Sequence, residues 1–248
     1  MNRFSVVIPS RYASIRLPGK PLREINGKTM LEHVYERGKE SAAADVLIAT
    51  DDERIAEAAE QFGAQVCMTG DQHRSGTERI AEVCDLMDWE DERIVVNLQG
   101  DEPTMPAGLI NQCAALLQES SADIATLASP IASQADFANP NIVKVIRDAA
   151  GDAIYFSRAA IPFAREEGGE DLARSAALHH HGIYAYRCGV LRRLVAAEPS
   201  DIETCEQLEQ LRALSLGMTI RVGIPAERPG AGVDTEDDLA AVAAYLPH

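Results

Sequence analysis

Short apolar runs alternate along the chain with longer segments in which apolar residues recur about one helical turn apart. The runs predict β-strands at residues 4–8, 46–49, 94–98, 142–146 and 219–224. The segments with a helical period predict helices at residues 30–39, 53–62, 77–87, 109–117 and 208–216. Because strands and helices alternate, the pattern predicts an α/β fold with a mostly parallel sheet that is covered by helices.

The last segment carries the clearest helical pattern. From Leu239 onward, apolar residues follow at the i+3, i+4 and i+7 positions, and Thr235 and Asp238 have the spacing of a capping box. The paired glycines within residues 166–170 predict a surface loop, and the sequence shows no repeat or long linker. We therefore expect residues 1–248 to form one continuous domain.

Composition narrows the classes of protein that this fold could serve. The chain has 248 residues, of which 46% are hydrophobic and 25% charged, so one α/β domain can bury a full core. A formal charge of −16 argues against nucleic acid or an anionic membrane as the main partner, since both need an extended basic surface. No stretch approaches the ~20 apolar residues of a membrane span. The five cysteines form no C-x-x-C pair, so we expect a soluble, reduced, cytoplasmic protein.

Positive charge is concentrated at the start of the chain. Residues 1–28 contain six lysines and arginines against the single acid Glu24. Three of these cations, Arg11, Arg16 and Lys20, follow the first predicted strand, and ligands bind at the carboxyl ends of strands in a parallel sheet. The loop matches neither the P-loop nor the dinucleotide-binding glycine pattern, so it is either a solvated surface or a pocket for a triphosphate.

The same loop resembles a known family. Arg11 and Lys20 have the spacing of the R-x(8)-K signature of sugar nucleotidyltransferases, and residues 12–14 and 16–22 resemble its 3-deoxy-manno-octulosonate cytidylyltransferase branch. The resemblance implies that Arg11 and Lys20 bind the triphosphate of CTP and assist catalysis. It also implies a Rossmann-like domain of the glycosyltransferase-A type with a small dimerisation subregion, for which residues 142–161 are the expected homodimer interface.

Two aspartates are candidates for a metal site. Asp101 follows the strand at 94–98 after Gln99 and Gly100, and Asp234 precedes the last helix. Asp101 alone could be a turn residue, and Asp234 alone could cap a helix. The resemblance matches both segments to metal-ligand motifs, so it implies Mg²⁺ held by Asp101 and Asp234, a catalytic role for Asp101, and a substrate contact for Gln99. Carboxylate oxygens are ligands that Mg²⁺ prefers.

Two further segments are expected to contact the nucleotide. Thr50 and Asp51 follow the second predicted strand, although a helix N-cap would also explain them. Ser75 and Arg79 lie at the start of a predicted helix, in a segment that resembles the family's S-G-T-E-R motif beside cytosine and sugar. The resemblance therefore implies substrate-binding roles for these four residues.

An acidic sugar requires cations, and Arg79 and Arg158 are the candidates. The aromatic residues before Arg158 suggest partial burial, so an internal salt bridge is the alternative to substrate binding. The Y-F-S-R segment resembles the family's contact with the substrate carboxylate. Glu209 and Gln210 lie on a predicted helix, and they could simply belong to its solvated face. The resemblance instead implies that Glu209 and Gln210 contact sugar hydroxyls.

The remaining candidates belong to a run of three histidines and the strand pattern after it. His179, His180 and His181 would alternate between the two faces of a strand, so they cannot all bind one zinc ion. The resemblance implies that His180 is a polar substrate contact and that Tyr184 is a further, weaker candidate.

These residues together predict a reaction. The resemblance implies transfer of CMP from CTP to 3-deoxy-D-manno-octulosonate (KDO), which gives CMP-KDO and pyrophosphate for lipopolysaccharide biosynthesis. The alternatives are a cytidylyltransferase for sialic acid or 8-amino-KDO, and a non-catalytic CTP-binding regulator. In its sharpest form, the prediction places five residues in one pocket: Arg79, Arg158, His180, Glu209 and Gln210.

Overall fold

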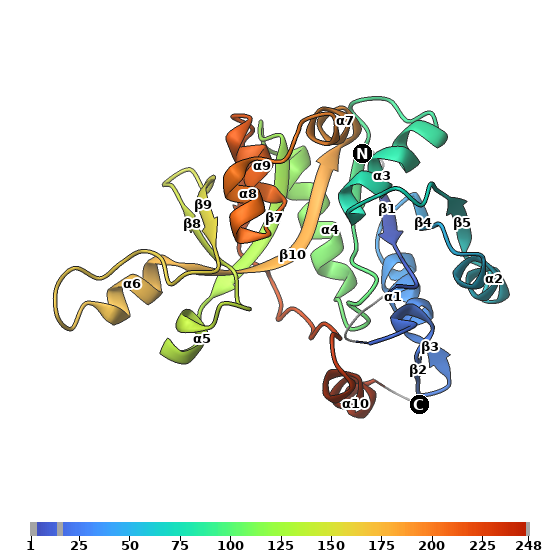
Figure 1. The fold of residues 1–248 in the computed structure, drawn as a ribbon, viewed down its shortest axis with the longest axis horizontal. Coiled ribbons are helices and arrows are strands. Elements are labelled where there is room, and N and C mark those ends of the chain that lie inside the picture. The colour runs from blue at the N-terminus through green and yellow to red at the C-terminus, as the bar shows by residue number, and fades with distance from the viewer. Residues whose placement is uncertain (1–3, 14–16, 247–248) are drawn as a thin grey trace.

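A nine-stranded sheet runs through the computed structural model, which describes residues 4–13 and 17–246 (Figure 1). Its strands are β1 (Phe4–Pro9), β4 (Asp45–Thr50), β5 (Gln65–Met68), β6 (Ile94–Asn97), β7 (Ile124–Pro130), β8 (Lys144–Arg147), β9 (Ala153–Ser157), β10 (Leu178–Arg187) and β11 (Ile220–Gly223). A separate hairpin consists of β2 (Glu24–Ile25) and β3 (Lys28–Thr29). Every strand predicted from the sequence is therefore present.

The main sheet is mostly parallel, as the sequence predicts. In the order β11-β7-β10-β6-β1-β4-β5, neighbouring strands are parallel except where β10 runs antiparallel to β7 and β6. Strand β8 lies off this path and pairs antiparallel with β9 and with the start of β10. The carboxyl ends of β1, β4 and β6 therefore meet at one edge of the sheet, where ligands bind in such folds.

Helices cover both faces of this sheet. They are the 3₁₀ helix η1 (Lys20–Leu22) and the α-helices α1 (Met30–Glu40), α2 (Glu53–Gln61), α3 (Gly76–Leu86), α4 (Ala107–Gln118), α5 (Gln134–Ala138), α6 (Glu170–Ala176), α7 (Cys188–Val195), α8 (Asp201–Glu206), α9 (Gln210–Ser215) and α10 (Glu236–Tyr245). Alternate residues of β1 face opposite layers: Val7 packs in the cluster that contains α3 and α7, whereas Val6 and Ile8 pack with α1 and α4. No helix of the described residues is long and apolar enough to cross a membrane.

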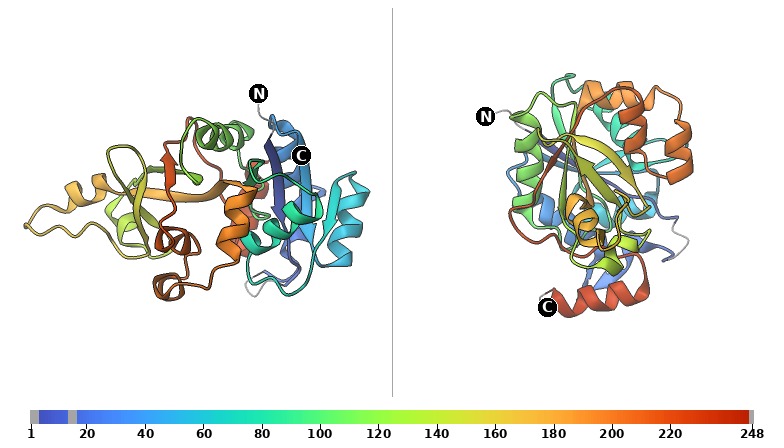
Figure 2. Two further views of the ribbon diagram at one scale, coloured as in Figure 1. Left: turned by 90° about the horizontal axis from the view of Figure 1, so that it is seen from above. Right: turned by 90° about the vertical axis from the view of Figure 1, so that its left-hand side faces the viewer.

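One end of the molecule carries an extension, residues 131–177. It contains α5, β8, β9 and α6, and it projects away from the parallel strands β1, β4 and β5 (Figure 2). Ile131, Phe137 and Ala173 belong to its own small apolar cluster. The predicted dimer interface at residues 142–161 lies within this extension.

The C-terminal helix α10 braces the N-terminal loop. Its predicted capping box is present: the Thr235 hydroxyl accepts from the Asp238 N–H at 3.2 Å, and the Asp238 carboxylate accepts from the Thr235 N–H at 2.9 Å. Val242 of α10 packs in one apolar cluster with Leu17 and Ile25. Helix α10 therefore packs against the segment that leads into η1, although α10 and η1 lie near opposite ends of the sequence.

The helix predicted at residues 208–216 begins two residues later in the structure. Gln207 ends α8 in the left-handed conformation, with φ of 52°, so the chain turns before α9 starts at Gln210. This turn leaves Leu208 and Glu209 outside the helix. The loop predicted at residues 166–170 is present, and its last residue begins α6.

A buried ion pair fixes α8 against α9, and its removal should be costly. The Arg212 guanidinium donates to the two carboxylate oxygens of Glu203 at 2.6 and 2.8 Å, and both side chains are 9% exposed. Glu203→Ala should lower the free energy of unfolding by about 3 kcal/mol, because it leaves the buried guanidinium without its counter-charge. Urea unfolding of the variant measures this loss. The exposed Glu198→Ala is the control, and an equal loss in both variants would contradict the assignment.

Candidate active site

Two adjoining cavities open near the carboxyl ends of the parallel strands. The first, of about 420 Å³, is lined by the loops that follow β1 and β6 and by the start of α3. The second, of about 340 Å³, is lined by β10 and by the connection between α8 and α9. Gly76, Gln99 and Glu209 line both cavities, so the two spaces are halves of one site.

The first cavity brings together all four residues predicted to bind triphosphate or metal: Arg11, Lys20, Asp101 and Asp234. Four residues predicted to contact the nucleotide or the sugar also line it: Ser75, Arg79, Gln99 and Glu209. Arg11 is exposed on the loop after β1, where its guanidinium is available to an anionic ligand. Ser14 and Arg16 of the same loop lie outside the described residues.

Lys20 joins the two predicted metal ligands. Its ammonium donates to Asp101 Oδ2 at 2.6 Å and to Asp234 Oδ1 at 2.9 Å. The Val233 N–H donates to the Asp101 carbonyl at 2.9 Å, which ties the two acidic segments together through the backbone. Gly19 precedes Lys20 with φ of 66°, a left-handed conformation that glycine adopts without strain. Three segments that are distant in sequence therefore converge on one point.

A third acid, Glu102, lies beside this pair. Burial, reinforced by the negative charge of Asp101, raises the pKa of the Glu102 carboxyl to about 8. At neutral pH the Glu102 carboxyl therefore adds little negative charge to the site. Within the described residues, no group of three or more His, Cys, Asp or Glu side chains could hold a metal by itself. Two carboxylates that leave positions for phosphate oxygens and water are the ligand set that Mg²⁺ commonly uses.

Arg79 reaches the first cavity from a fixed position. Its side chain is 6% exposed, and its guanidinium pairs with Asp51 at 2.9 Å and donates to the Thr69 hydroxyl and to the Gly70 carbonyl. Thr50 is fully buried, and neither Thr50 nor Asp51 is among the described residues that line the two cavities. The structure thus places Asp51 as the counter-charge of Arg79.

The start of α3 is held at the junction of the two cavities. The Ser75 hydroxyl accepts from the Glu78 N–H at 3.3 Å and so caps the helix. In the first turn of α3, the Thr77 hydroxyl donates to the Glu209 carboxylate at 2.6 Å. This bond brings Glu209 to both cavities, and Gln210 follows it as a lining residue of the second cavity.

His180 lies on the face of β10 that lines the second cavity. Its Nε2 is 3.0 Å from the Thr126 hydroxyl, and its ring meets Phe156 edge to face. The rings of His179 and His181 lie against each other, with centroids 4.7 Å apart. The predicted alternation of the three histidines between two faces is therefore present.

Buried polar atoms without partners mark the second cavity. Among the described residues, Tyr184 Oη and Asn97 Oδ1 are buried, have no hydrogen-bond partner, and belong to side chains that line this cavity. Among the same described residues, Ser10 Oγ is also buried without a hydrogen-bond partner, and Ser10 lines the first cavity. Unpartnered buried polar atoms are costly, so they point to a polar ligand. Asn97 and Ser10 were not predicted, although each is a polar residue at the end of an apolar strand.

Arg158 does not share the second cavity with His180, Glu209 and Gln210, contrary to the one-pocket prediction. It is absent from the described residues that line either cavity. Its guanidinium donates to the carbonyls of Glu206 at 2.8 Å, Pro140 at 3.2 Å and Gln207 at 3.4 Å. Arg79 is separate too, since it lines only the first cavity. The five residues are therefore distributed around the two halves of the site.

The fold and the charged groups at its strand ends are those of a nucleotide-binding α/β protein. Comparison with known proteins then gives the family, because a family model described as Cytidylyltransferase matches residues 5–220. The chain belongs to the cytidylyltransferase family.

Relatives and solved structures agree with this family. The chain is 52% identical over 241 residues to a 3-deoxy-manno-octulosonate cytidylyltransferase of Vibrio vulnificus (strain YJ016), with 96% of each chain covered. It is also 52% identical to the enzyme of the same name from Idiomarina loihiensis (strain ATCC BAA-735 / DSM 15497 / L2-TR), with 95% of each covered. A solved CMP:2-keto-3-deoxy-manno-octonic acid synthetase complexed with CTP has 41% identity, a TM-score of 0.90 and 98% coverage of both chains. A 4-diphosphocytidyl-2C-methyl-D-erythritol synthase, at 17% identity and a TM-score of 0.63, shares the fold.

The buried His180 should make the protein less stable in acid. Burial, with smaller contributions from His181 and His179, lowers the pKa of His180 to about 3, from 6.5. Between these two values the unfolded chain binds the proton and the folded chain does not, so stability is lost as the pH falls. His180 should remove about 3 kcal/mol of stability between about pH 6.5 and about pH 4.

Urea unfolding across this pH range measures the effect. The loss of stability with falling pH should be shallower in His180→Gln than in the unchanged protein, because glutamine does not titrate. His181, whose pKa burial lowers to about 4, is present in both proteins and does not affect the comparison. Equal slopes would contradict a neutral buried His180.

Proposed function

We propose that the protein transfers CMP from CTP to KDO and releases pyrophosphate, as a step of lipopolysaccharide biosynthesis. The observation that carries this proposal is the 52% identity to enzymes named for 3-deoxy-manno-octulosonate, which extends over 96% of the chain. The two adjoining cavities support it. Positively charged side chains that could bind a triphosphate line the first cavity, and polar side chains that could bind a sugar line the second.

In the proposed reaction, the anomeric 2-hydroxyl oxygen of the sugar attacks the α-phosphorus of CTP. A new phosphorus–oxygen bond forms, the bond to the bridging oxygen of pyrophosphate breaks, and the hydroxyl proton leaves to solvent. Negative charge grows on the departing pyrophosphate, so fixed cations stabilise the transition state. Arg11 is suited to hold phosphate oxygens in two hydrogen bonds, and Lys20 acts as a point charge.

We assign Mg²⁺ to Asp101 and Asp234 in this proposal. Both carboxylates already meet a positive group, the Lys20 ammonium, so the fold brings them close enough for one cation. When bound, Mg²⁺ would neutralise phosphate charge and acidify the attacking hydroxyl. Arg11, Lys20 and the Mg²⁺ held by the two aspartates would then be the positive groups that meet the triphosphate.

The sugar is proposed to bind in the second cavity. His180, Tyr184, Gln99, Glu209 and Gln210 line it and provide donors and acceptors for hydroxyl groups, as the family resemblance implies. The neutral His180 ring and the unpartnered Tyr184 hydroxyl suit uncharged partners. Arg158 is the proposed contact for the sugar carboxylate, because it lies beside Gln207 at the rim of this cavity and is held by carbonyls, without a carboxylate on its guanidinium in the described structure.

A homodimer in the cytoplasm completes the proposal. The extension at residues 131–177 supports a dimer, because it exposes apolar side chains such as Ile154, 60% exposed, and Phe163, 89% exposed. All five cysteines are free, which suits a reducing compartment.

Sedimentation velocity tests the proposed dimer, because it measures the mass of the particle directly. Ile154→Asp should convert a dimer that forms through residues 142–161 to monomers.

Pyrophosphate release with different sugars tests the proposed function. CTP should support release with KDO at a far higher kcat/KM than with sialic acid or 8-amino-KDO. A preference for either of those sugars would replace the acceptor. If CTP binds but no sugar supports release, the protein is a CTP-binding regulator and the proposal is wrong.

Asp101→Asn should abolish most of the activity while leaving the fold unchanged. The amide keeps the size of the side chain but removes the charge proposed to hold Mg²⁺, so kcat should fall at least about a hundredfold. The control is Asp148→Asn, an aspartate that accepts backbone hydrogen bonds in a turn outside both cavities. Unchanged kcat for Asp101→Asn at limiting Mg²⁺ would exclude the metal assignment.

A further inference from the structure

Lys144 is a fully buried lysine, with 0% of its surface exposed. Its ammonium donates to three backbone carbonyls: Ile142 and Arg158, each at 2.6 Å, and Asn139 at 2.9 Å. No ion pair between Lys144 and a carboxylate is recorded in the described part of the chain. Burial lowers the pKa of this ammonium. A buried charge without a paired carboxylate is expensive, and the nearby negative charge of Glu206 offsets only part of this cost.

The three carbonyls belong to two segments that Lys144 ties together. Asn139 and Ile142 form the turn that leads into β8, and Arg158 directly follows β9. An apolar side chain of the same length would fill the space but would remove a donor from all three carbonyls, of which the Asn139 carbonyl would keep the Ile142 N–H. Lys144 therefore fixes the backbone of Arg158 through its carbonyl group.

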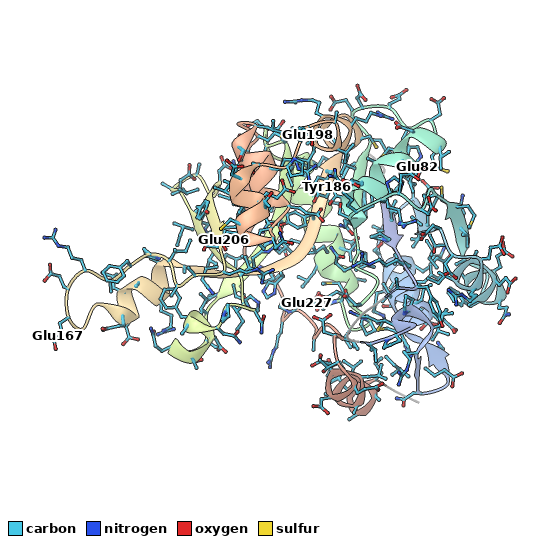
Figure 3. All side chains as sticks on the ribbon, viewed as in Figure 1. Glu82, Glu167, Tyr186, Glu198, Glu206 and Glu227 are labelled. Carbon is cyan, nitrogen blue, oxygen red and sulfur yellow. The ribbon has the colours of Figure 1, made fainter. Side chains whose placement is uncertain are left out.

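Glu206 holds the same residue from the opposite side. Its carboxylate accepts from the Ser157 hydroxyl at 2.6 Å and from the Arg158 N–H at 2.9 Å. Figure 3 labels Glu206, the last residue of α8, on the side of α8 that faces the β8–β9 hairpin. The backbone N–H of Arg158 is thus held by Glu206, its carbonyl by Lys144, and its guanidinium by the carbonyls of Pro140, Glu206 and Gln207.

This arrangement also reaches the wall of the second cavity. Val143, the neighbour of Lys144, lines that cavity, and its carbonyl accepts from the His180 N–H at 2.9 Å. Gln207, which accepts from Arg158, lines the same cavity. A shift of the turn at residues 139–142 would therefore move Arg158 relative to the groups that are proposed to bind the sugar.

We propose that Lys144 is a positioning residue for the sugar half of the site, which it serves by holding Arg158 beside the second cavity with Glu206 as its counterpart. The inference rests on the proposed function, in which the Arg158 guanidinium meets the sugar carboxylate. Lys144 itself does not touch the substrate, because its ammonium is fully buried and its donors are used on the backbone. Its effect should therefore be confined to sugar binding and should disappear when Arg158 is absent.

A double-mutant cycle tests this inference, with KM for KDO, KM for CTP and kcat measured separately. Lys144→Met and Arg158→Ala should each raise KM for KDO by about tenfold or more, as expected for loss of a well-placed charged hydrogen bond. KM for CTP should change less than about twofold. The double variant should bind KDO no more weakly than Arg158→Ala alone, because Lys144 acts through Arg158. Multiplication of the two single effects, or a parallel rise in KM for CTP, would overturn the proposal.

Two further variants separate positioning from general loss of stability. Arg187→Met removes another cation that donates to backbone carbonyls, those of Ala122 and Leu117, outside both cavities. It should lower the melting temperature without raising KM for KDO, and a rise equal to that of Lys144→Met would overturn the proposal. If Lys144→Met does not fold, Glu206→Ala tests the same restraint from the other side. Glu206→Ala should raise KM for KDO, and this rise should not add to the rise caused by Arg158→Ala. An unchanged KM would overturn the proposal.

The cycle also distinguishes failure of this inference from failure of the proposed function. If the unchanged protein releases no pyrophosphate with KDO, the proposed function is wrong and the inference falls with it. If KDO is a substrate but Arg158→Ala leaves its KM unchanged, the proposed carboxylate contact is wrong. A raised KM in Lys144→Met under that condition would overturn positioning through Arg158 while leaving the reaction itself in place.

Discussion

The contact of the Lys20 ammonium with Asp101 and Asp234 determines how the rest of the site is assembled. It joins residues that are 81 and 214 positions apart in the sequence. Two carboxylates repel each other, so they come close only where a cation lies between them. The N-terminal loop, the end of β6 and the start of α10 must therefore fold together, and the packing of Leu17 against α10 is the apolar counterpart of the same constraint.

The antiparallel strand β10 gives the site its second half. It enters between β6 and β7, with an irregular register between His180 and Tyr184. Tyr184 and Tyr186 point to the same face and stack with centroids 5.6 Å apart, while Asn97 of β6 lies opposite Tyr184. An aromatic wall with polar tips provides apolar contact and hydrogen bonding together, which is what a hydroxylated, partly apolar ring requires. In a purely parallel sheet, consecutive neighbouring strands would be joined by a crossover helix.

The sequence predicted the parts of this fold that have a strong local pattern. The apolar runs of β1 and β6 and the capping box of α10 depend on neighbouring residues, so they can be recognised without coordinates. Strand β7 has small residues and a threonine in place of a continuous apolar run, and its position in the sheet comes from pairing with β10 and β11. The helices α7 and α8 were missed because they have only eight and six residues, too few for the sequence to distinguish a helix from a short strand.

For the site, the sequence placed candidate residues at strand ends but not their contacts with one another. Lys20 was predicted to bind the triphosphate and Asp101 and Asp234 a metal, and the direct contact of Lys20 with both aspartates was not predicted. The pairing of Arg79 with Asp51 was not predicted, because both lie in segments whose local roles, a helix start and a strand end, already explain their presence. The position of Arg158 outside the second cavity was not predicted either, because its guanidinium is held by the carbonyls of three residues distant in sequence, Pro140, Glu206 and Gln207.

The partners of the buried cations suggest how the fold separates stability from ligand binding. Arg212 and Arg79 each meet a carboxylate, so their charge is neutralised within the protein. Lys144 and the Arg158 guanidinium donate to carbonyls, which satisfy hydrogen bonds but leave a net positive charge. A backbone dipole neutralises a cation less well than a carboxylate does, and the Glu206 carboxylate, which accepts from the Arg158 N–H, offsets only one of these two positive charges. In a protein with a formal charge of −16, the remaining positive charge is what would draw an acidic sugar toward the second cavity.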